Sequence, residues 1–227
     1  MRIAVVIPTL NEAAHLPRLL ADLAGEDLIA AIIVSDGGST DGTVELARAA
    51  GARVIGGGGP PGRGAQIARG VAEAESAFVP EWLWLLHADS RLPPDWPRRV
   101  ASLLDHPDTA WYGRLRFTSD DPRARLLEAG VALRCAAFRL PYGDQSLLIR
   151  PALLRACGGV PDLPLMEDVL LARRLRRYLR PMPLVIRTDA AAYERDGWLR
   201  RAGRNLWLLT RFLRGAEVAR LARAYRR

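Results

Sequence analysis

The chain has 227 residues, which suits one large domain, or one domain with an appendage, and is ample for a hydrophobic core. Hydrophobic residues make up 49% and charged residues 26%, a globular composition that excludes disorder over most of the chain. The 33 basic and 25 acidic side chains give a formal net charge of +8, which favours anionic partners such as nucleotide phosphates or an anionic membrane surface.

The first half of the chain alternates between strand-like and helix-like patterns. Apolar runs predict buried strands at Ile3–Ile7, Ile29–Val34 and Trp82–Leu86, and a short strand is predicted at Arg53–Ile55. Between them, helices are predicted around Leu16–Leu23, at Thr43–Ala50 and at Ala65–Ala74, with a loop at Gly56–Gly64. Repeated strand–helix units of this length predict an α/β fold, with a mostly parallel sheet and helices on both faces.

The second half of the chain has a less regular pattern. Strands are predicted at Trp111–Phe117, Gln145–Ile149 and Leu184–Ile186, the last at a sheet edge. Helices are predicted at Pro122–Phe138, Pro151–Cys157 and Glu167–Tyr178. Pro181 and Pro183 are expected to end the last of these helices. From Trp198 onward the chain is predicted to be helical, with a break near Gly215.

Polar side chains gather where the predicted strands end. Thr9, Asn11 and Glu12 follow the first strand, Asp36 follows the second, and Asp89 follows the fourth. Ligands of open α/β sheets bind at the carboxyl ends of the strands. Separate segments are therefore predicted to converge on one binding edge of the sheet.

The glycine-rich turn after the second strand contains two carboxylates with different predicted roles. Asp41 can cap the helix that follows. Asp36 lies outside the capping position, so we expect its carboxylate to accept hydrogen bonds from the base or ribose of a ligand. Gly37 and Gly38 would let the backbone approach that ligand closely.

Two further segments hold candidate groups for binding charge. Arg63, at a helix start within Gly62–Gln66, can bind an anion through its guanidinium and nearby backbone N–H groups. We interpret Asp89 as a ligand for a divalent cation rather than as the cap of a turn. For His87 two interpretations stay open: a metal ligand, better suited to Mn²⁺ than to Mg²⁺, or a hydrogen-bonded histidine at a strand end.

Glu167 and Asp168 open a predicted helix. The helix dipole favours acidic residues there, so simple capping explains them. The functional alternative is a general base that deprotonates an acceptor hydroxyl. Local spacing does not choose between the two residues.

Four motifs occur in order along the chain: Val6–Glu12, Val34–Thr43, Leu86–Asp89 and Glu167–Asp168. Together they resemble family 2 glycosyltransferases with the GT-A fold, the fold of nucleotide-diphospho-sugar transferases, and they look closest to short soluble bacterial members. The resemblance runs from about Arg2 to Tyr178. It implies transfer of a sugar from a UDP- or GDP-sugar to an acceptor hydroxyl.

The resemblance implies which residues line the nucleotide pocket. They are Pro8, Thr9, Asn11, Glu12, Asp36, Arg63, Gly64 and Ala88. In such enzymes Glu12 would lie near the ribose, Asp36 would contact the base, and Arg63 would lie near the diphosphate.

The resemblance also implies the reacting groups. Asp89 would bind Mg²⁺ or Mn²⁺ with His87 as a second ligand, and Asp168 would be the catalytic base of an inverting reaction. Asp144, Gln145 and Glu167 would lie toward the acceptor.

Two positions depart from the family pattern. His87 stands where many relatives have the first aspartate of a DxD motif. Residues 189–193 hold alanines where arginines are expected, which leaves Arg195, Arg200 and Arg201 as nearby substitutes. These departures favour an alternative function, a membrane-peripheral nucleotide-sugar-binding module without turnover. A nucleotidyltransferase is a second alternative, although it needs a glycine-rich signature with lysine where this chain has Pro8–Glu12.

The predicted division of the chain places a GT-A domain at residues 1–197, with a nucleotide-binding half (1–104) and an acceptor-side half (105–197). An amphipathic basic helical segment follows at residues 198–227. This segment either docks on the domain with a solvated arginine face or lies on anionic lipid, which would suit a lipid-like acceptor. It has no aromatic platform for stacking bases, so nucleic acid is not an expected partner.

Cys135 and Cys157 form no CxxC pair, which excludes a zinc ribbon and favours a reducing compartment. No apolar run approaches the roughly 20 residues of a membrane span, and the run after Met1 is too short for a signal peptide. We therefore expect a cytoplasmic protein, with a peripheral position at the inner face of the membrane as a second option.

Overall fold

The structure, a computed structural model, describes residues 2–56 and 62–225. The strands are β1 (Ile3–Thr9), β2 (Ile29–Asp36), β3 (Arg53–Gly56), β4 (Trp82–Leu85), β5 (Ala110–Phe117), β6 (Leu147–Ile149) and β7 (Leu179–Thr188). The helices are α1 (Leu16–Leu23), α2 (Thr43–Ala49), α3 (Arg63–Phe78), α4 (Trp96–Ala101), α5 (Pro122–Phe138), α6 (Pro151–Ala156), α7 (Glu167–Leu175), α8 (Ala191–Asp196), α9 (Trp198–Leu213) and α10 (Val218–Tyr225), with a 3-10 helix η1 (Gly143–Gln145).

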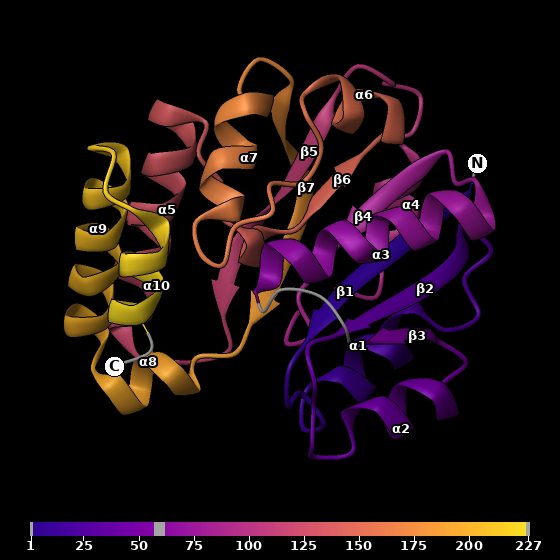
Figure 1. Cartoon of the computed structure of the whole chain (residues 1–227), viewed down its shortest axis with the longest axis horizontal. Helices are drawn as coiled ribbons and strands as arrows, with labels where there is room; N and C mark the ends of the chain where they lie inside the picture. Colours follow the sequence, from indigo (N-terminus) through magenta and orange to yellow (C-terminus); the bar gives the residue numbers. More distant parts are fainter. Residues whose placement is uncertain (1, 57–61, 226–227) are drawn as a thin grey trace.

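Within this part of the chain the strands form one seven-stranded sheet in the order β3-β2-β1-β4-β6-β5-β7 (Figure 1). β1 pairs in parallel with β2 and β4, and β2 pairs in parallel with β3, so the carboxyl ends of these strands meet at one edge. β6 runs antiparallel to β4 and β5, whereas β5 and β7 are parallel. The predicted α/β class with a mostly parallel sheet is confirmed.

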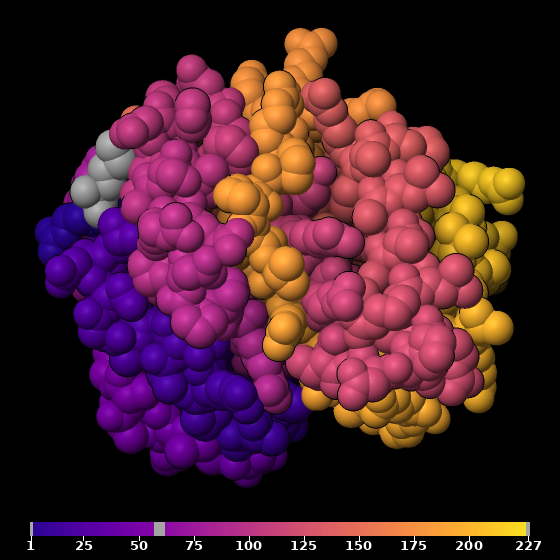
Figure 2. Space-filling view, turned by 180° about the vertical axis from the view of Figure 1, so that it is seen from behind, coloured from indigo at the N-terminus to yellow at the C-terminus, as the bar shows by residue number. Residues whose placement is uncertain are grey.

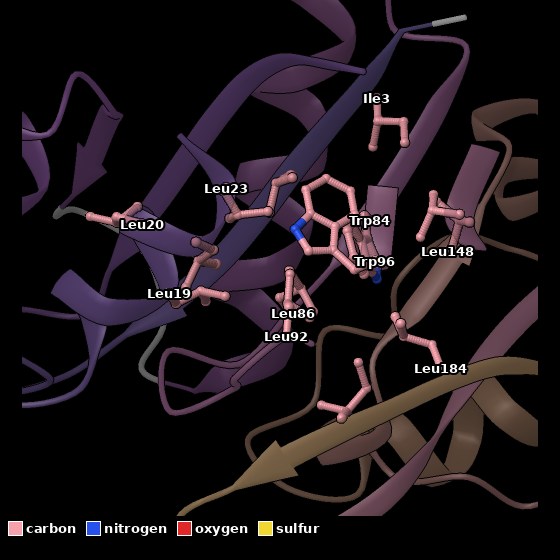
Figure 3. Close-up of a cluster of buried hydrophobic side chains, with 14 of the residues drawn as sticks. Ile3, Leu19, Leu20, Leu23, Trp84, Leu86, Leu92, Trp96, Leu148 and Leu184 are labelled. Carbon is pink, nitrogen blue, oxygen red and sulfur yellow. The ribbon is translucent and has the colours of Figure 1, made fainter. Parts of the chain in front are cut away.

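Two hydrophobic layers cover the two faces of the sheet. On one face Trp84 of β4 packs against Trp96 of α4, with ring centroids 5.1 Å apart, in a cluster that includes Leu23 of α1 (Figure 3). On the other face Val6 of β1 and Ile67 of α3 belong to a second cluster. Every residue of β1 is buried, because side chains that point to either face of this strand meet a layer of helices.

The last strand differs from its prediction. β7 is longer than Leu184–Ile186, and Pro181 and Pro183 lie inside it instead of ending α7, which stops at Leu175. β7 is an edge strand, where a proline removes no hydrogen bond that the sheet requires, and its register with β5 shifts opposite these prolines. In Figure 2 the orange residues of β7 lie at the surface between the magenta and pink parts of the chain.

Four further elements differ from what the sequence predicts. The short helices α4 and α8 have too few residues for a clear periodic pattern and were not predicted. Gln145 belongs to η1 and not to the strand that follows, which begins at Leu147. The predicted loop Gly56–Gly64 includes residues 57–61, which lie outside the described residues, and α3 already begins at Arg63.

The C-terminal helices stand beside α5, at the end of the sheet that β5 and β7 form (Figure 1). The turn between α9 and α10 confirms the predicted break near Gly215. Trp198 is 2% exposed, and its ring lies 5.3 Å from both Phe117 of β5 and Tyr193 of α8. This aromatic packing fixes α8 and α9 against the end of β5. Over the described residues, no helix combines the length and apolarity that a membrane crossing requires.

Candidate active site

The carboxylate of Asp36 organises the turn at the end of β2. Asp36 is 4% exposed, and Oδ2 accepts the backbone N–H groups of Gly38 and Ser39, both at 2.8 Å. Oδ1 accepts the hydroxyls of Thr9 at 3.0 Å and Ser39 at 2.6 Å. Burial raises the pKa of Asp36, but these hydrogen bonds outweigh it and hold the pKa below its usual value. Asp36 lies outside the cap of α2, whose N-cap is Gly42, but its carboxylate is already engaged by the hydrogen bonds of its own turn.

The segment after β1 is joined to the same turn by reciprocal hydrogen bonds. The N–H of Asn11 donates to Ser39 Oγ at 2.8 Å, and Asn11 Oδ1 accepts from the N–H of Thr40 at 2.9 Å. The N–H of Glu12 donates to Thr43 Oγ1 at 2.8 Å. Asn11 has a φ of 57°, a left-handed conformation that asparagine tolerates better than most residues. The ends of β1 and β2 thus form one rigid rim.

Gln66 of α3 stabilises this rim by hydrogen bonds to the backbone of both strands. Its Nε2 donates to the carbonyl oxygens of Thr9 at 2.6 Å and Ser35 at 3.1 Å, so one buried amide holds the last residues of β1 and β2 together. Glycine at position 64 lets the start of α3 approach the chain at Leu163, whose carbonyl oxygen would lie 2.7 Å from any Cβ there. This close approach brings Arg63 to the residues before α7.

Arg63 is held by the two acidic residues that open α7. Its Nε donates to Glu167 Oε1 at 2.5 Å, and its Nη2 lies 3.4 Å from Asp168 Oδ2. Glu167 is 2% exposed, and burial raises its pKa even though the charge of Arg63 opposes that shift. The two acidic residues, between which the sequence did not choose, differ in their surroundings. Glu167 is buried against Arg63, whereas Asp168 lines a cleft.

Asp168 and His87 meet at Gly143. The N–H of Gly143 donates to Asp168 Oδ2 at 2.9 Å, and Oδ1 of the same carboxylate accepts from Val169. A Cβ at position 143 would lie 2.6 Å from His87 Nε2 and 3.6 Å from Asp168 Oδ2. Glycine at position 143 therefore lets the side chains of His87 and Asp168 both approach the backbone of this residue.

His87 is neutral at physiological pH. Burial, followed by the positive charge of Arg63, lowers its pKa to about 4. Its Nε2 is buried and has no hydrogen-bond partner among the described residues, which leaves a lone pair of the imidazole free or an N–H unsatisfied. Such an orphaned nitrogen is costly unless a ligand satisfies it.

Asp89 joins β4 to the end of β7. Its Oδ2 accepts the hydroxyl of Thr188 at 2.5 Å and the N–H of Asp189 at 3.3 Å. The charge of Asp89, after burial itself, raises the pKa of Glu12, so the rim and the strand-end aspartate share one electrostatic environment. No group of three or more histidine, cysteine or acidic side chains is arranged to hold a metal in residues 2–56 and 62–225. Any divalent cation there would need oxygens from its ligand and from water as well.

Asp144 and Gln145, neighbours in η1, face different surroundings. Gln145 is 2% exposed, and its amide bonds to Gly113, Arg134 and Tyr142, so it supports the loop and does not reach the cleft. Asp144 lines the cleft, and its Oδ1 is buried with no hydrogen-bond partner in the part of the chain described. Burial raises its pKa to about 6, with Arg134 opposing the shift and Asp168 adding to it.

The reacting groups converge on one cleft with a volume of about 230 Å³. It is lined by Arg63, His87, Asp89, Asp144 and Asp168, which come from different segments. Pro8, Thr9, Asn11, Glu12, Asp36, Gly64, Ala88, Gln145 and Glu167 do not line it. Of these, Pro8, Thr9, Asn11, Glu12 and Asp36 lie at the rim formed by the ends of β1 and β2, whereas Gly64, Ala88, Gln145 and Glu167 lie on other segments.

The far wall of the cleft was largely missed by the sequence analysis. It is formed by Thr188 of β7, Tyr193 of α8 and Asn205 of α9, among others. Of the three arginines suggested as substitutes, Arg201 lines the cleft, whereas Arg195 and Arg200 do not. No local motif marks these residues, because helix packing brings them to the site. The amphipathic pattern from residue 198 onward was the available indication that this segment packs against the domain.

Comparison with known proteins places this geometry in context. The family model "Glycosyl transferase family 2" matches residues 4–155. Glucosyl-3-phosphoglycerate synthase from Mycobacterium tuberculosis, solved with Mn²⁺, UDP-glucose and phosphoglyceric acid, is similar in structure with a TM-score of 0.58 at 24% identity. The match covers 82% of this chain and 70% of that one. A further solved mycobacterial protein has a TM-score of 0.56 at 25% identity, over 82% of this chain and 64% of the other.

A curated relative matches a shorter stretch. The succinoglycan biosynthesis protein ExoA of Rhizobium meliloti (strain 1021) is 50% identical over 46 residues. The match covers 19% of this chain and 14% of ExoA, so this chain matches only a small part of that protein.

Proposed function

The chain belongs to glycosyl transferase family 2, and on that premise we propose that it transfers a sugar from a nucleotide-diphosphate sugar to an acceptor hydroxyl with inversion. The observation that supports this proposal is the convergence of Arg63, Asp89 and Asp168 on one cleft beside the rim of β1 and β2. A cation, a carboxylate for a metal and a second carboxylate for a proton are the groups that such a transfer needs.

The nucleoside lies at the rim in this proposal. Asp36 and Thr9 stand where the base would bind, with Asn11 and Glu12 toward the ribose. The Asp36 carboxylate already accepts four hydrogen bonds from the protein, and these shape the turn. It would contact the base directly once a hydroxyl such as that of Ser39 turned away from it. Pro8, Gly64 and Ala88 would complete the pocket through close approach of the backbone. The similar synthase holds UDP-glucose, which supports a UDP-sugar ahead of a GDP-sugar.

Mg²⁺ or Mn²⁺ would be held by Asp89 and His87. The donor set fits a divalent cation: His87 presents a neutral imidazole with an unpartnered Nε2, and Asp89 contributes a carboxylate. When bound, the cation would neutralise charge on the departing diphosphate. The similar synthase has been solved with Mn²⁺ and with Mg²⁺, in both cases together with UDP.

Asp168 would act as the general base. The acceptor oxygen forms a bond to the anomeric carbon and gives its proton to Asp168, while the bond from that carbon to the diphosphate breaks and its electron pair leaves with the nucleoside diphosphate. The Gly143 N–H and Arg63 would orient this carboxylate. Arg63, fixed in turn by Glu167, would also stabilise charge on the leaving group.

The variant Asp168→Asn tests this assignment. We expect kcat with a UDP- or GDP-sugar to fall by at least about a hundredfold, while binding of UDP measured by calorimetry is unchanged. Asp105→Asn, an exposed aspartate after α4, is the matched control and should behave like the wild type. Equal activity of Asp168→Asn and wild type would rule out Asp168 as the base. Binding of a nucleotide sugar with no turnover by either protein would favour a binding module. Failure of every UDP- and GDP-sugar to bind with Mg²⁺ or Mn²⁺ present would rule out the transfer itself.

A further inference from the structure

A large apolar groove runs between α5 and α9, with a volume of about 850 Å³. One side is formed by α5, including Leu127, Val131 and Phe138, and the other by α9, including Leu206 and Leu209. Its volume lies in the upper range of pockets that bind small molecules, and those pockets are also predominantly apolar. The α5 side of the groove lies within the residues 4–155 that the family model matches, whereas the α9 side lies beyond them.

The rim of the groove exposes large apolar side chains to water. Leu133 is 69% exposed, Phe138 63%, Leu206 61% and Leu213 48%. Together with the groove they form one continuous apolar surface, and extended surfaces of this kind mark sites for binding. The charged heads of Arg173 and Arg176, which also line the groove, belong to exposed residues.

The groove adjoins the catalytic cleft and shares part of its wall. Phe117, Tyr142, Asp144, Tyr193 and Asn205 line both cavities. Among the lining groups they share, the buried Oδ1 of Asp144 has no hydrogen-bond partner in the described part of the chain. A hydroxyl placed at this junction could donate to Asp144 while the rest of its molecule extends between the two helices.

We infer that the α5–α9 groove binds the apolar chain of the acceptor, and that the acceptor's hydroxyl lies at Asp144 within reach of the cleft. The acceptor class is thus an amphiphile with a long hydrocarbon chain and a free hydroxyl group. This inference rests on the proposed sugar transfer, because it assigns the acceptor of that reaction. Asp144 lies in the wall that the groove shares with the cleft, as the binding of an acceptor requires. Docking of a protein partner on the groove would not require this shared wall.

A series of linear primary alcohols from 1-butanol to 1-decanol tests the inference by calorimetry. Affinity should rise about fourfold for each added methylene until the groove is filled. Dependence on chain length is a property that a polar acceptor site would lack. The same alcohols, offered with UDP-glucose, should show a KM that falls in parallel with the dissociation constant.

A variant that fills the groove provides the second arm. Gly130 of α5 lines the groove, and a Cβ there would meet nothing within 4 Å, so Gly130→Trp should occupy the groove without disturbing the fold. We expect it to weaken 1-decanol binding by at least about tenfold and to leave UDP binding unchanged. Gly203→Trp is the matched control: position 203 also lies in open space, on α9, but outside the groove.

The outcomes separate the two proposals. Affinities that do not depend on chain length, or equal 1-decanol binding by both tryptophan variants, would overturn the groove assignment. So would a change of oligomeric state in Gly130→Trp, measured by sedimentation, with 1-decanol binding unchanged, since the groove would then be a contact between copies. Binding of 1-decanol without binding of any nucleotide sugar would contradict the sugar transfer alone.

Discussion

Asp144 lies at the junction of cleft and groove, and its carboxyl group is the clearest case of an altered protonation equilibrium at the site. Burial raises its pKa from 3.8 to about 6. The unfolded chain ionises this group near its ordinary pKa, so between pH 4 and pH 6 the folded protein holds a proton that the unfolded chain has lost. Asp144 therefore contributes most to stability at low pH, and that contribution is lost as the pH rises to about 6.

Asp144→Asn removes this pH dependence. The free energy of unfolding of the variant minus that of wild type should be about 1–3 kcal/mol higher at pH 7.5 than below pH 4, so the variant gains in relative stability as the pH rises. Urea denaturation at both pH values measures the difference. Asp105→Asn, an exposed change of the same kind, should show no such trend. An identical gap between Asp144→Asn and wild type at both pH values would contradict the buried, protonated state.

At the scale of elements, the start of α3 depends on the close approach of Gly64 to the backbone of Pro161 and Leu163. Gly64→Ala would place a Cβ 2.7 Å from the carbonyl oxygen of Leu163, a backbone atom that cannot move aside cheaply. We expect the unfolding free energy to fall by about 1–3 kcal/mol. Arg63, the neighbouring residue, would be displaced from Glu167 and Asp168, so UDP should also bind more weakly. Thermal unfolding and calorimetry measure the two effects.

Gly130→Ala is the control for that change. It introduces the same methyl group into α5, where nothing lies within 4 Å, and alanine favours a helix over glycine by up to about 1 kcal/mol. This variant should be slightly more stable than wild type and should bind UDP equally well. If both alanine variants had the same effect, the cost would come from loss of glycine in general and not from the contact of α3 with Leu163.

Elements whose patterns are local were predicted well from the sequence. The buried run of β1 and the helix Pro122–Phe138 were found because periodicity within one segment encodes them. The edge position of β7 was predicted correctly, but its length was not, because Pro181 and Pro183 were interpreted as the end of a helix although an edge strand tolerates proline. The predicted division at residue 197 stays a prediction, although aromatic contacts of Trp198 tie α9 to β5.

In the site, too, residues placed by local patterns could be predicted from the sequence, whereas contacts between distant segments could not. The residues at strand ends could be predicted, because a parallel sheet brings its carboxyl ends together. The ion pair of Arg63 with Glu167 spans 104 positions, and no spacing rule reports such a partner. The inward turn of Asp36 and the cleft wall from α8 and α9 likewise depend on tertiary packing.

At the scale of the whole molecule, charge and exposed apolar groups gather on the C-terminal helices. Arg200, Arg211, Arg214, Arg220 and Arg223 are exposed. Leu199 is 67% exposed, Leu206 61%, Trp207 49% and Leu213 48%. Leu206 and Leu213 also form the rim of the groove, so a bilayer that covered this surface would lie at the entrance through which an apolar acceptor arrives. Attachment to anionic lipid, the alternative to a docked helix with a solvated arginine face, would therefore have a functional consequence for the acceptor.

Sedimentation with vesicles tests this attachment. The protein should bind vesicles that contain phosphatidylserine and not vesicles of phosphatidylcholine alone, and binding should be lost at about 1 M salt, where the Debye length is about 3 Å. Trp207→Glu puts an acid into the exposed apolar surface and should weaken binding by about tenfold. Leu46→Glu makes a comparable change at a 41% exposed leucine on α2, far from α9, and should have no effect (Figure 1). Equal binding to both kinds of vesicle, or an equal loss of vesicle binding in both variants, would contradict attachment to anionic lipid. The C-terminal helices would then only dock on the domain, with a solvated arginine face.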